Sequence, residues 1–544
     1  MSQTNTPATE VEENGQVNPS KPLSEGLKLK IKAMQEEFYD AVKRAQYVDA
    51  KTIENSDNAS EYFYDRLHGY EKKLLNKVSP LDDWRAEELE KLRKALTDSK
   101  QDLINAFESI YKRSAENTQL YELDLILDEL DNTIANYKYW VREKIDTPLT
   151  YNNTDSFLYY EPVGLVLIIG EWQSPLYSLL KPAISAIAAG NHVILYADPQ
   201  VKKVIDVLNN VLTRHTDEKR IQIITDRTSY EQLLDLPINF VYASGTPAQC
   251  KEIYKLAGER GIPAALSERA LNVAVVHKSA DLNLATEKIV LSRFINAGQY
   301  NTSTDHVYVH ESLFTDFLVK AKIHIYCNYA NPEKNRDYGR LINQDQVKKI
   351  LDIASAESHE GQLETKINYD LEGNLVEPII ITNPGETSRA VSYPVRGPVL
   401  SIIKYKDIEE VTNKLKGRAH INNVYYFAND TEQSARFIAK VNNCNVFINE
   451  AGTQYFNFNL PLGSVGGIYN AKIGGAYGVR TFSNSRVVTE GKGLRQFKSL
   501  IPPISGTRYT TFHRFDLLKK FTIRQGRALT TGAGLLLAYW FLKK

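Results

Sequence analysis

Cysteine and net charge are both scarce in this sequence. Three cysteines occur among its 544 residues, and they lie far apart, at Cys250, Cys327 and Cys444. Thiols so few and so scattered exclude a disulfide framework and a cysteine-rich metal site, and they favour folding in a reducing compartment. Lys and Arg total 66 and Asp and Glu total 66, so the formal net charge is zero. This balance lacks the basic excess of nucleic-acid-binding proteins, and no nucleic-acid partner is expected.

Long apolar runs are also rare, and both ends of the chain differ from its middle. Residues 1–26 contain no apolar run and predict a disordered tail without a signal peptide. The stretch Ala528–Leu542 is uncharged, but as a helix it would measure only about 22 Å, less than the roughly 30 Å of a bilayer core. Cations on both sides favour a membrane anchor over residues 528–544. A terminal helix packed on the body or on a partner is the other interpretation.

The segment before this run is basic and amphipathic. Within residues 501–527, the stretch Phe512–Arg527 places apolar and cationic side chains on two faces of a helix, a pattern that suits an anionic membrane surface. We therefore expect attachment to the cytosolic face of an intracellular membrane.

Hydrophobic periodicity divides the rest of the chain into helical and α/β regions. Residues 27–83 place apolar residues every three or four positions, which predicts a helical N-terminal extension. The same pattern over residues 83–107 predicts a further helix. Val163–Gly170 is a short apolar run that ends in glycine, as buried parallel strands do. A helical stretch and the strand-like His192–Ala197 follow it, which completes a βαβ unit. The alternation continues to residue 266 and predicts a doubly wound parallel sheet over residues 84–266.

A second α/β block spans residues 267–449. Asn272–His277, His306–His310, Val399–Tyr405 and Asn423–Phe427 are strand-like, and helical stretches separate them. His306 and His310 would share a strand face about 13 Å apart, too far for one metal ion. We expect no metal site.

Several of these segments resemble the aldehyde dehydrogenase superfamily, nearest its fatty-aldehyde branch. The similarity extends from Trp84 to Arg486. It is carried by EPVGLVLIIG (Glu161–Gly170), KPAISAIAAGNHVIL (Lys181–Leu195), VYASGTP (Val241–Pro247), the stretch Asn272–Asn301, RGPVLSIIKYKDIEE (Arg396–Glu410) and GAYGVRTFSNSR (Gly475–Arg486). The resemblance implies an aldehyde dehydrogenase-like α/β fold with a Rossmann-type domain and a second α/β domain. It also implies a return segment and oligomerisation arm over residues 450–500. Gly478–Val488 within this range and Tyr151–Tyr160, much earlier in the chain, match the family's arm strands.

The family's catalytic positions carry other residues in this chain. Family members attack the aldehyde through a cysteine thiolate, whose position is Asn301 here. A carboxamide is no nucleophile at physiological pH. Ser267 stands where the family has its glutamate base, and Glu268 would reach that position only by a one-residue slip that loses the match at Asn272. Gln173 replaces the asparagine that stabilises the oxyanion.

The family's cofactor positions are altered as well. Tyr196 stands in place of the lysine and Pro199 in place of the glutamate that hold the adenosine ribose, and the glycine–serine pair is Gly245-Thr246. Pro394 replaces the glutamate that holds the nicotinamide ribose, and Arg396 replaces the following aromatic residue. Proline offers no side-chain hydrogen bond. We therefore expect no bound cofactor, or NAD or NADP if the chain is an active enzyme.

Three functions remain open on this basis. The first is a catalytically inactive protein of this fold that acts as a membrane-attached binding or regulatory subunit. The alternative is NAD(P)-dependent oxidation of fatty aldehydes with an atypical nucleophile, for which Thr302, Ser303 and Thr304 are the nearest hydroxyls. The third is a different activity, or a retained ligand-binding role, in the crevice at the carboxyl ends of the strands. We expect a homodimer or a hetero-oligomer with an active relative, on the endoplasmic reticulum, lipid droplets or the mitochondrial outer membrane.

Overall fold

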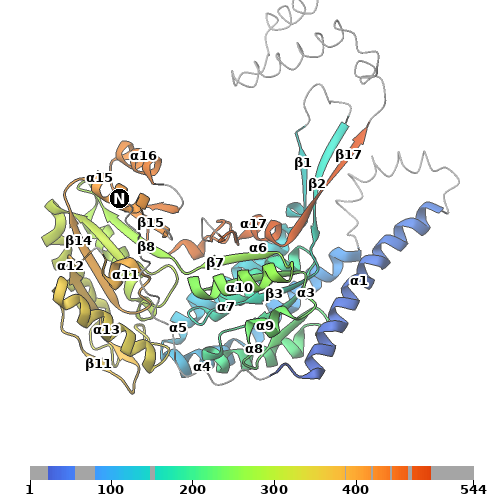
Figure 1. Ribbon diagram of the computed structural model, residues 1–544, viewed down its shortest axis with the longest axis horizontal. Helices are drawn as coiled ribbons and strands as arrows, with labels where there is room; N and C mark the ends of the chain where they lie inside the picture. Colours follow the sequence, from blue (N-terminus) through green and yellow to red (C-terminus); the bar gives the residue numbers. More distant parts are fainter. Residues whose placement is uncertain are drawn as a thin grey trace, which may run out of the picture.

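The computed structural model describes residues 22–54, 80–146, 154–385, 387–417, 421–441, 444–463 and 468–491. A parallel sheet and a second sheet that is parallel except for one edge strand form the body, and a three-stranded arm projects from it (Figure 1). The predicted basic linker (501–527) and membrane anchor (528–544) lie outside the described residues. Among the residues that the structure describes, no helix is both long and apolar enough to cross a membrane. The predicted tail ends slightly too late, because a helix already begins at Glu25.

The first sheet has five parallel strands in the order β5-β4-β3-β6-β7. The strands are β3 (Leu165–Ile169), β4 (His192–Tyr196), β5 (Ile221–Ile224), β6 (Phe240–Gly245) and β7 (Ala264–Glu268). The helices between them are α7 (Pro175–Ala188), α8 (Lys202–His215), α9 (Tyr230–Leu234) and α10 (Pro247–Glu259). The prediction that Val163–Gly170 and His192–Ala197 form neighbouring parallel strands is confirmed. Strand order reverses between β3 and β6, so a crevice opens at their carboxyl ends.

The two faces of this sheet belong to different hydrophobic clusters. Val166 and Ile168 of β3 pack in one cluster with α7, α8 and the helices that precede the sheet. Leu165 and Leu167 face the opposite cluster with α9, α10 and helix α1 (Glu25–Glu54). Because successive side chains of a strand point to opposite faces, the all-apolar sequence of β3 supplies both cores.

The helices before the sheet are broken more often than the sequence pattern suggested. They are α3 (Pro80–Asp98), α4 (Lys100–Tyr111), α5 (Ala115–Thr118), the π-helical turn η1 (Gln119–Asp124) and α6 (Leu125–Trp140). The apolar periodicity of residues 83–107 continues through the break at Ser99, which is why the sequence predicts one helix there.

The second sheet has seven strands in the order β10-β13-β14-β9-β8-β15-β16. The strands are β8 (Leu271–Val276), β9 (His306–His310), β10 (Gln362–Leu363), β13 (Ile379–Thr382), β14 (Val399–Tyr405), β15 (Ile421–Phe427) and β16 (Asn445–Ile448). Its helices are α11 (Leu282–Phe294), α12 (Phe314–Tyr329), α13 (Gln344–Glu360), α14 (Arg389–Ser392), α15 (Ile408–Gly417) and α16 (Thr431–Lys440), and β11 (Tyr369–Asp370) pairs with β12 (Leu375–Val376) beside it. Strand β7 of the first sheet ends at Glu268, and β8 of the second sheet begins at Leu271. The connection between the sheets therefore lies at residues 269–270, two residues after the predicted domain boundary at 267.

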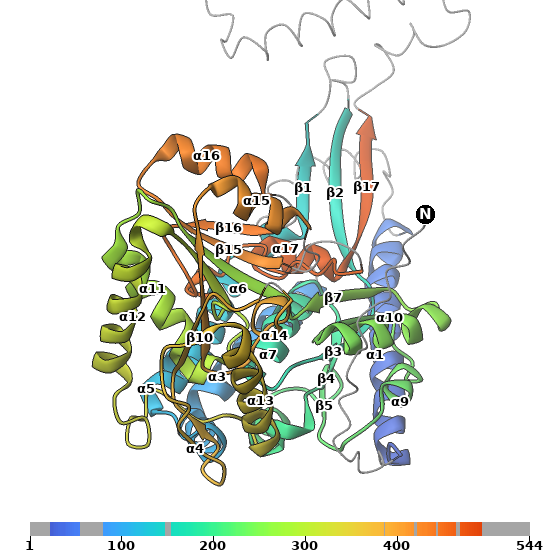
Figure 2. The ribbon, with the colours of Figure 1, turned by 60° about the vertical axis from the view of Figure 1, so that its left-hand side comes forward.

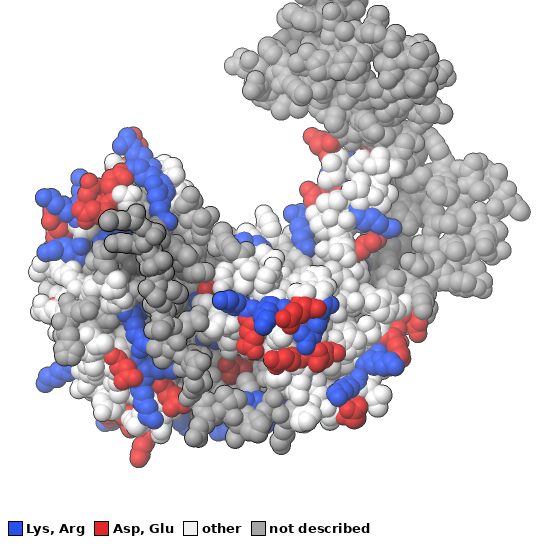
Figure 3. Space-filling model, viewed as in Figure 1, with Lys and Arg blue, Asp and Glu red and all other residues white. Residues whose placement is uncertain are grey.

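The arm is an antiparallel sheet of β1 (Arg142–Ile145), β2 (Thr154–Pro162) and β17 (Ser483–Gly491), with β2 in the middle. Figure 2 shows it standing away from both sheets. The predicted arm strand Gly478–Val488 begins too early, because residues 478–481 belong to helix α17 (Gly475–Thr481). On the face of the body seen in Figure 3, basic and acidic side chains are interspersed, in keeping with the zero net charge.

Candidate active site in the crevice between the sheets

A polar cavity lies where the carboxyl ends of the first sheet meet the second sheet. Its volume is about 60 Å³, and Ser244, Ser267, Glu268, Asn301 and Thr302 are among its lining residues. These side chains come from β6, from β7 and from the loop before β9. The crevice expected from the strand order is therefore lined by residues of both sheets.

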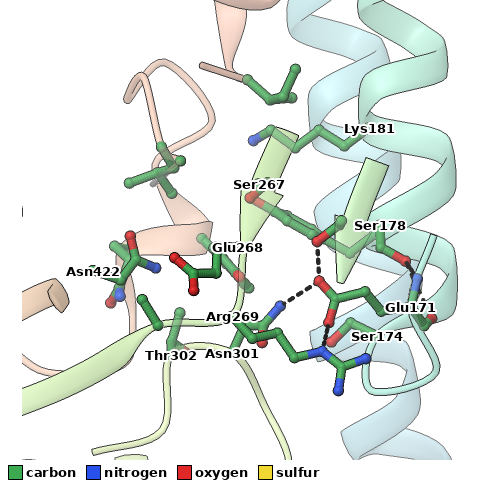
Figure 4. A pocket seen from close by; sticks show the side chains of 18 of the residues that line it. Glu171, Ser174, Ser178, Lys181, Ser267, Glu268, Arg269, Asn301, Thr302 and Asn422 are labelled. Carbon is green, nitrogen blue, oxygen red and sulfur yellow. Dashed lines mark hydrogen bonds and ion pairs between the residues drawn. The ribbon is translucent and has the colours of Figure 1, made fainter. Parts of the chain in front are cut away.

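Glu171 is the centre of a hydrogen-bonded cluster in this cavity. It follows β3 at the point where strand order reverses, and it is 2% exposed. Its carboxylate forms an ion pair with Arg269 and accepts hydrogen bonds from Ser244 Oγ and, at 3.0 Å, from Asn301 Nδ2 (Figure 4). A buried carboxylate needs such partners to stay charged. Glu171 thus connects the first sheet to the loop that carries Asn301.

The loop that carries Asn301 is held by its backbone. It follows the turn η4 (Ile295–Gly298), in which Gly298 has a φ of 73°. A Cβ at Gly298 would lie 2.4 Å from the carbonyl oxygen of Gly397, so only glycine fits this close approach. Asn272 Nδ2 donates to the carbonyl oxygens of Asn301 at 2.7 Å and of Ser303 at 2.9 Å. The structure therefore places the Asn301 carboxamide in the cavity, in a fixed loop.

Glu268 is the site residue that sequence reasoning missed. It was expected to reach the crevice only by a slip that displaces Asn272, and this expectation is wrong. Ser267 and Glu268 are the last residues of β7 and both line the cavity, while Asn272 keeps its place in β8 opposite Asn423. Glu268 is 4% exposed. Burial, with the hydrogen-bonded Glu268 carboxylate, raises the pKa of Tyr469.

Gln173 and the three hydroxyl residues that follow Asn301 differ in whether they reach the cavity. Gln173 is fully buried, and its amide oxygen and nitrogen make no hydrogen bond within the described part of the chain. Of the three hydroxyls, Thr302 lines the cavity, Ser303 is fully buried, and Thr304 Oγ1 lies 2.5 Å from Ser292 Oγ. Of these three hydroxyl residues, Thr302 is therefore the one that lines the cavity.

A smaller, more aromatic pocket of about 20 Å³ lies on the other side of Thr302. Tyr121, Tyr300 and Phe456 are among the residues that line it. Behind Tyr300, the buried Arg113 donates to the Tyr300 hydroxyl and lies 3.1 Å from a carboxylate oxygen of Glu122. This cluster positions the residue directly before Asn301.

The predicted cofactor positions lie along the same edge of the first sheet. Tyr196 ends β4, and its hydroxyl donates to the carbonyl oxygen of Thr228 at 3.0 Å. Pro199 opens a short 3-10 turn, η3 (Pro199–Val201). Gly245 ends β6, and Thr246 caps α10 in a capping box with Gln249. This sequence therefore begins a helix at the sheet edge, as the capping residues dictate.

Pro394 and Arg396 lie on the side of the second sheet. Pro394 precedes Val395, whose backbone N–H donates to Asp305 at 3.0 Å. The Arg396 guanidinium is 6% exposed, with Nη1 3.9 Å from Asp305. Burial lowers the pKa of Arg396. Among the described residues no cluster of His, Cys, Asp and Glu has the composition of a metal site.

Comparison with known proteins identifies the family. The model of the aldehyde dehydrogenase family matches residues 76–488, and this chain belongs to that family. It is 26% identical over 462 residues to 4,4'-diaponeurosporen-aldehyde dehydrogenase of Staphylococcus aureus, covering 84% of this chain and 98% of that protein. It is 24% identical to the dimeric NADP-preferring aldehyde dehydrogenase of Mus musculus, covering 75% of this chain and 88% of that protein.

A solved structure shares the fold. The substrate-bound Staphylococcus aureus AldH superimposes with a TM-score of 0.74 at 24% identity, over 84% of this chain and 98% of the other. The predicted family and aldehyde dehydrogenase-like fold are therefore confirmed.

The expectation that no cofactor binds is wrong. Members of the aldehyde dehydrogenase family use NAD(P), and the mouse relative is named for its preference for NADP. The residues at the sheet edge fit a dinucleotide. Helix α10 presents its N-terminus there, where anions are stabilised, and Asp198, two residues beyond β4, has the carboxylate that such sites use for ribose hydroxyls. The sequence-based prediction considered only the positions at which the family's own contacts are replaced. A helix N-terminus and a carboxylate are nevertheless present close to those positions.

Proposed function

We propose that this chain carries out NAD(P)-linked oxidation of an aldehyde through its hydrate, with water instead of a cysteine as the nucleophile. The observation that carries the proposal is the buried carboxylate of Glu268, which lines the same cavity as Asn301 and Thr302. Family membership supports the reaction class.

The chemistry needs a base and an orienting group but no thiol. Water adds to the carbonyl, so the substrate carbon carries two hydroxyls and one hydrogen. NAD(P), when bound, supplies the acceptor for that hydrogen as hydride. Glu268 takes the proton of one hydroxyl while the C=O bond of the carboxylic acid forms, which balances the reaction. Asn301 Oδ1 makes no hydrogen bond within the described residues and can accept from the other hydroxyl.

Replacing Glu268 tests this proposal. Glu268→Gln keeps the shape of the side chain but removes the base, so NAD(P)H formation from hexanal or dodecanal should fall about 10²-fold. The absorbance of the reduced nicotinamide follows the reaction with NAD and with NADP. Glu259→Gln, an exposed change at the end of α10, is the matched control and should keep the full rate. Equal rates for the wild-type chain and Glu268→Gln would contradict the proposal.

A second candidate is a binding subunit that holds NAD(P) and aldehyde without turnover. The observation in its favour is that Asn301, in the nucleophile position, donates from its carboxamide to Glu171 at 3.0 Å. This candidate is distinguished by nucleotide binding in equilibrium titration with no NAD(P)H formed by the wild-type chain.

We also propose a dimer through the arm and membrane attachment through the C-terminal tail. Among the described residues β1 and β17 are the edge strands of the arm. Edge strands favour pairing with another chain, and the mouse relative is named as dimeric. The apolar run Ala528–Leu542 and the cations around it support attachment to an intracellular membrane. Vesicle flotation and sedimentation of the full chain and of a chain ending at Gly491 test both parts. Only the full chain should float with vesicles, and both chains should sediment as dimers. Flotation of both chains would contradict membrane attachment through the tail, and monomers of both would contradict the dimer.

A further inference from the structure

A lysine is buried in the wall of the crevice, where the reaction proposed above does not use it. Lys181 lies in the middle of α7, is 2% exposed and lines the polar cavity. Its neighbours in the helix, Leu179, Leu180, Ala183 and Ile184, are fully or almost fully buried apolar residues. A cation among such neighbours is costly unless it is paired. Figure 4 shows the amine extending from the helix on the side of Ser267 and Glu268.

The Lys181 amine lies beside one carboxylate and over one of two stacked rings. Glu129 of α6, itself buried, places a carboxylate oxygen 3.1 Å from Nζ. The Tyr177 ring lies below Nζ, with 5.2 Å to its centroid, and stacks on Tyr455 with 4.1 Å between centroids. Tyr177 and Tyr455 also line the cavity. The amine therefore has a proton acceptor on one side and a partly apolar cavity on the other.

We propose that Lys181 binds aldehydes covalently as an imine. In the ion pair, the ammonium proton moves to Glu129 and the neutral amine attacks the carbonyl carbon. The C–N bond forms, and an amine proton passes to the carbonyl oxygen. Glu129 then returns its proton to the hydroxyl, which leaves as water while the C=N bond forms. One aldehyde and one lysine give one protonated imine and one water, with no oxidant. The inference rests on the proposed function only in that an aldehyde enters the cavity.

A second lysine provides an internal comparison. Lys472 Nζ donates at 3.1 Å to the carbonyl oxygen of Gly463, a residue that lines the same cavity. Lys472 is half-buried, and burial lowers its pKa. A neutral amine is the reactive form, so Lys472 is the natural competitor for the same aldehyde. Labelling that depends on Lys181 but not on Lys472 would single out the paired amine.

Trapping the imine tests the proposal. The full chain is incubated with hexanal and sodium cyanoborohydride, without nucleotide, and the lysines that gain a hexyl group are located by peptide mass spectrometry. Lys181 should reach about tenfold higher occupancy than exposed lysines such as Lys138. Lys181→Arg, which keeps the charge beside Glu129 but cannot form the imine, should remove this label, whereas Lys472→Arg should keep it.

Two results would overturn the inference. One is labelling spread evenly over exposed lysines in the wild-type chain, which needs no variant to fold. The other is a dominant label on Lys472. Because the experiment contains no nucleotide, its failure is separate from failure of the proposed oxidation: NAD(P)H formation without a Lys181 label removes only the imine, and a label without NAD(P)H formation removes only the oxidation.

Discussion

A chain carrying Asn301→Cys and Glu171→Gln together is expected to form NAD(P)H on the order of 10³-fold faster than the wild type, because a positioned thiolate replaces water as the nucleophile. Both changes are needed. Glu171 lies 3.0 Å from the Asn301 side-chain nitrogen, and a carboxylate so close would raise the pKa of a thiol placed there. With glutamine at 171 this carboxylate is removed, while the Arg269 guanidinium that pairs with Glu171 in the wild type remains in the cluster and favours the thiolate.

The single variants are the controls. Asn301→Cys alone should gain little at neutral pH and more at alkaline pH, and Glu171→Gln alone should show no gain. The rates are read from the reduced nicotinamide over a pH series, with thermal melting to confirm folding. A single Asn301→Cys change that matches the double variant at neutral pH would show that Glu171 does not control this position.

Arg293→Ala is expected to lower the free energy of unfolding by about 3–5 kcal/mol, a large share of the total stability of an ordinary domain. Arg293 is fully buried and donates to the carbonyl oxygens of Thr304 at 3.0 Å, Val395 at 2.6 Å and Gly397. It also pairs with the buried Asp305 at 3.4 Å. Alanine would remove this donor from the three buried carbonyl oxygens and would take one cationic partner from the buried Asp305.

Urea unfolding followed by circular dichroism measures this loss. Arg214→Ala, in the exposed last turn of α8, is the matched control and should change stability by no more than about 0.5 kcal/mol. A loss below about 1 kcal/mol for Arg293→Ala would mean that water or a neighbouring cation replaces the guanidinium. Because Arg293 also holds the loop around Asn301 and the Gly397 segment together, any oxidation activity should fall with it.

The fold was predictable from the sequence wherever the apolar pattern of a short segment by itself specified a strand or a helix. β3 and β4 are short apolar runs on either side of a helix, and such runs become adjacent parallel strands with little help from the rest of the chain. The same local reading failed at Ser99, where helical periodicity continues across a break, and at residues 478–481, which are helical although they match an arm strand in the family. In these places the boundary depends on packing, which periodicity does not record.

For the site, the sequence by itself determined which groups are present. It established that position 301 carries a carboxamide and position 267 a hydroxyl, because identity at an aligned position needs no coordinates. Only the tertiary structure decided which other groups lie beside them in the cavity. Glu268 reaches the cavity because β7 ends there, and Glu171 meets Arg269 and Asn301 because strand order reverses after β3. Lys181 lines the same cavity from a helix that is otherwise uncharged. Side chains far apart in sequence converge only when both sheets are in place, and no local pattern specifies that convergence.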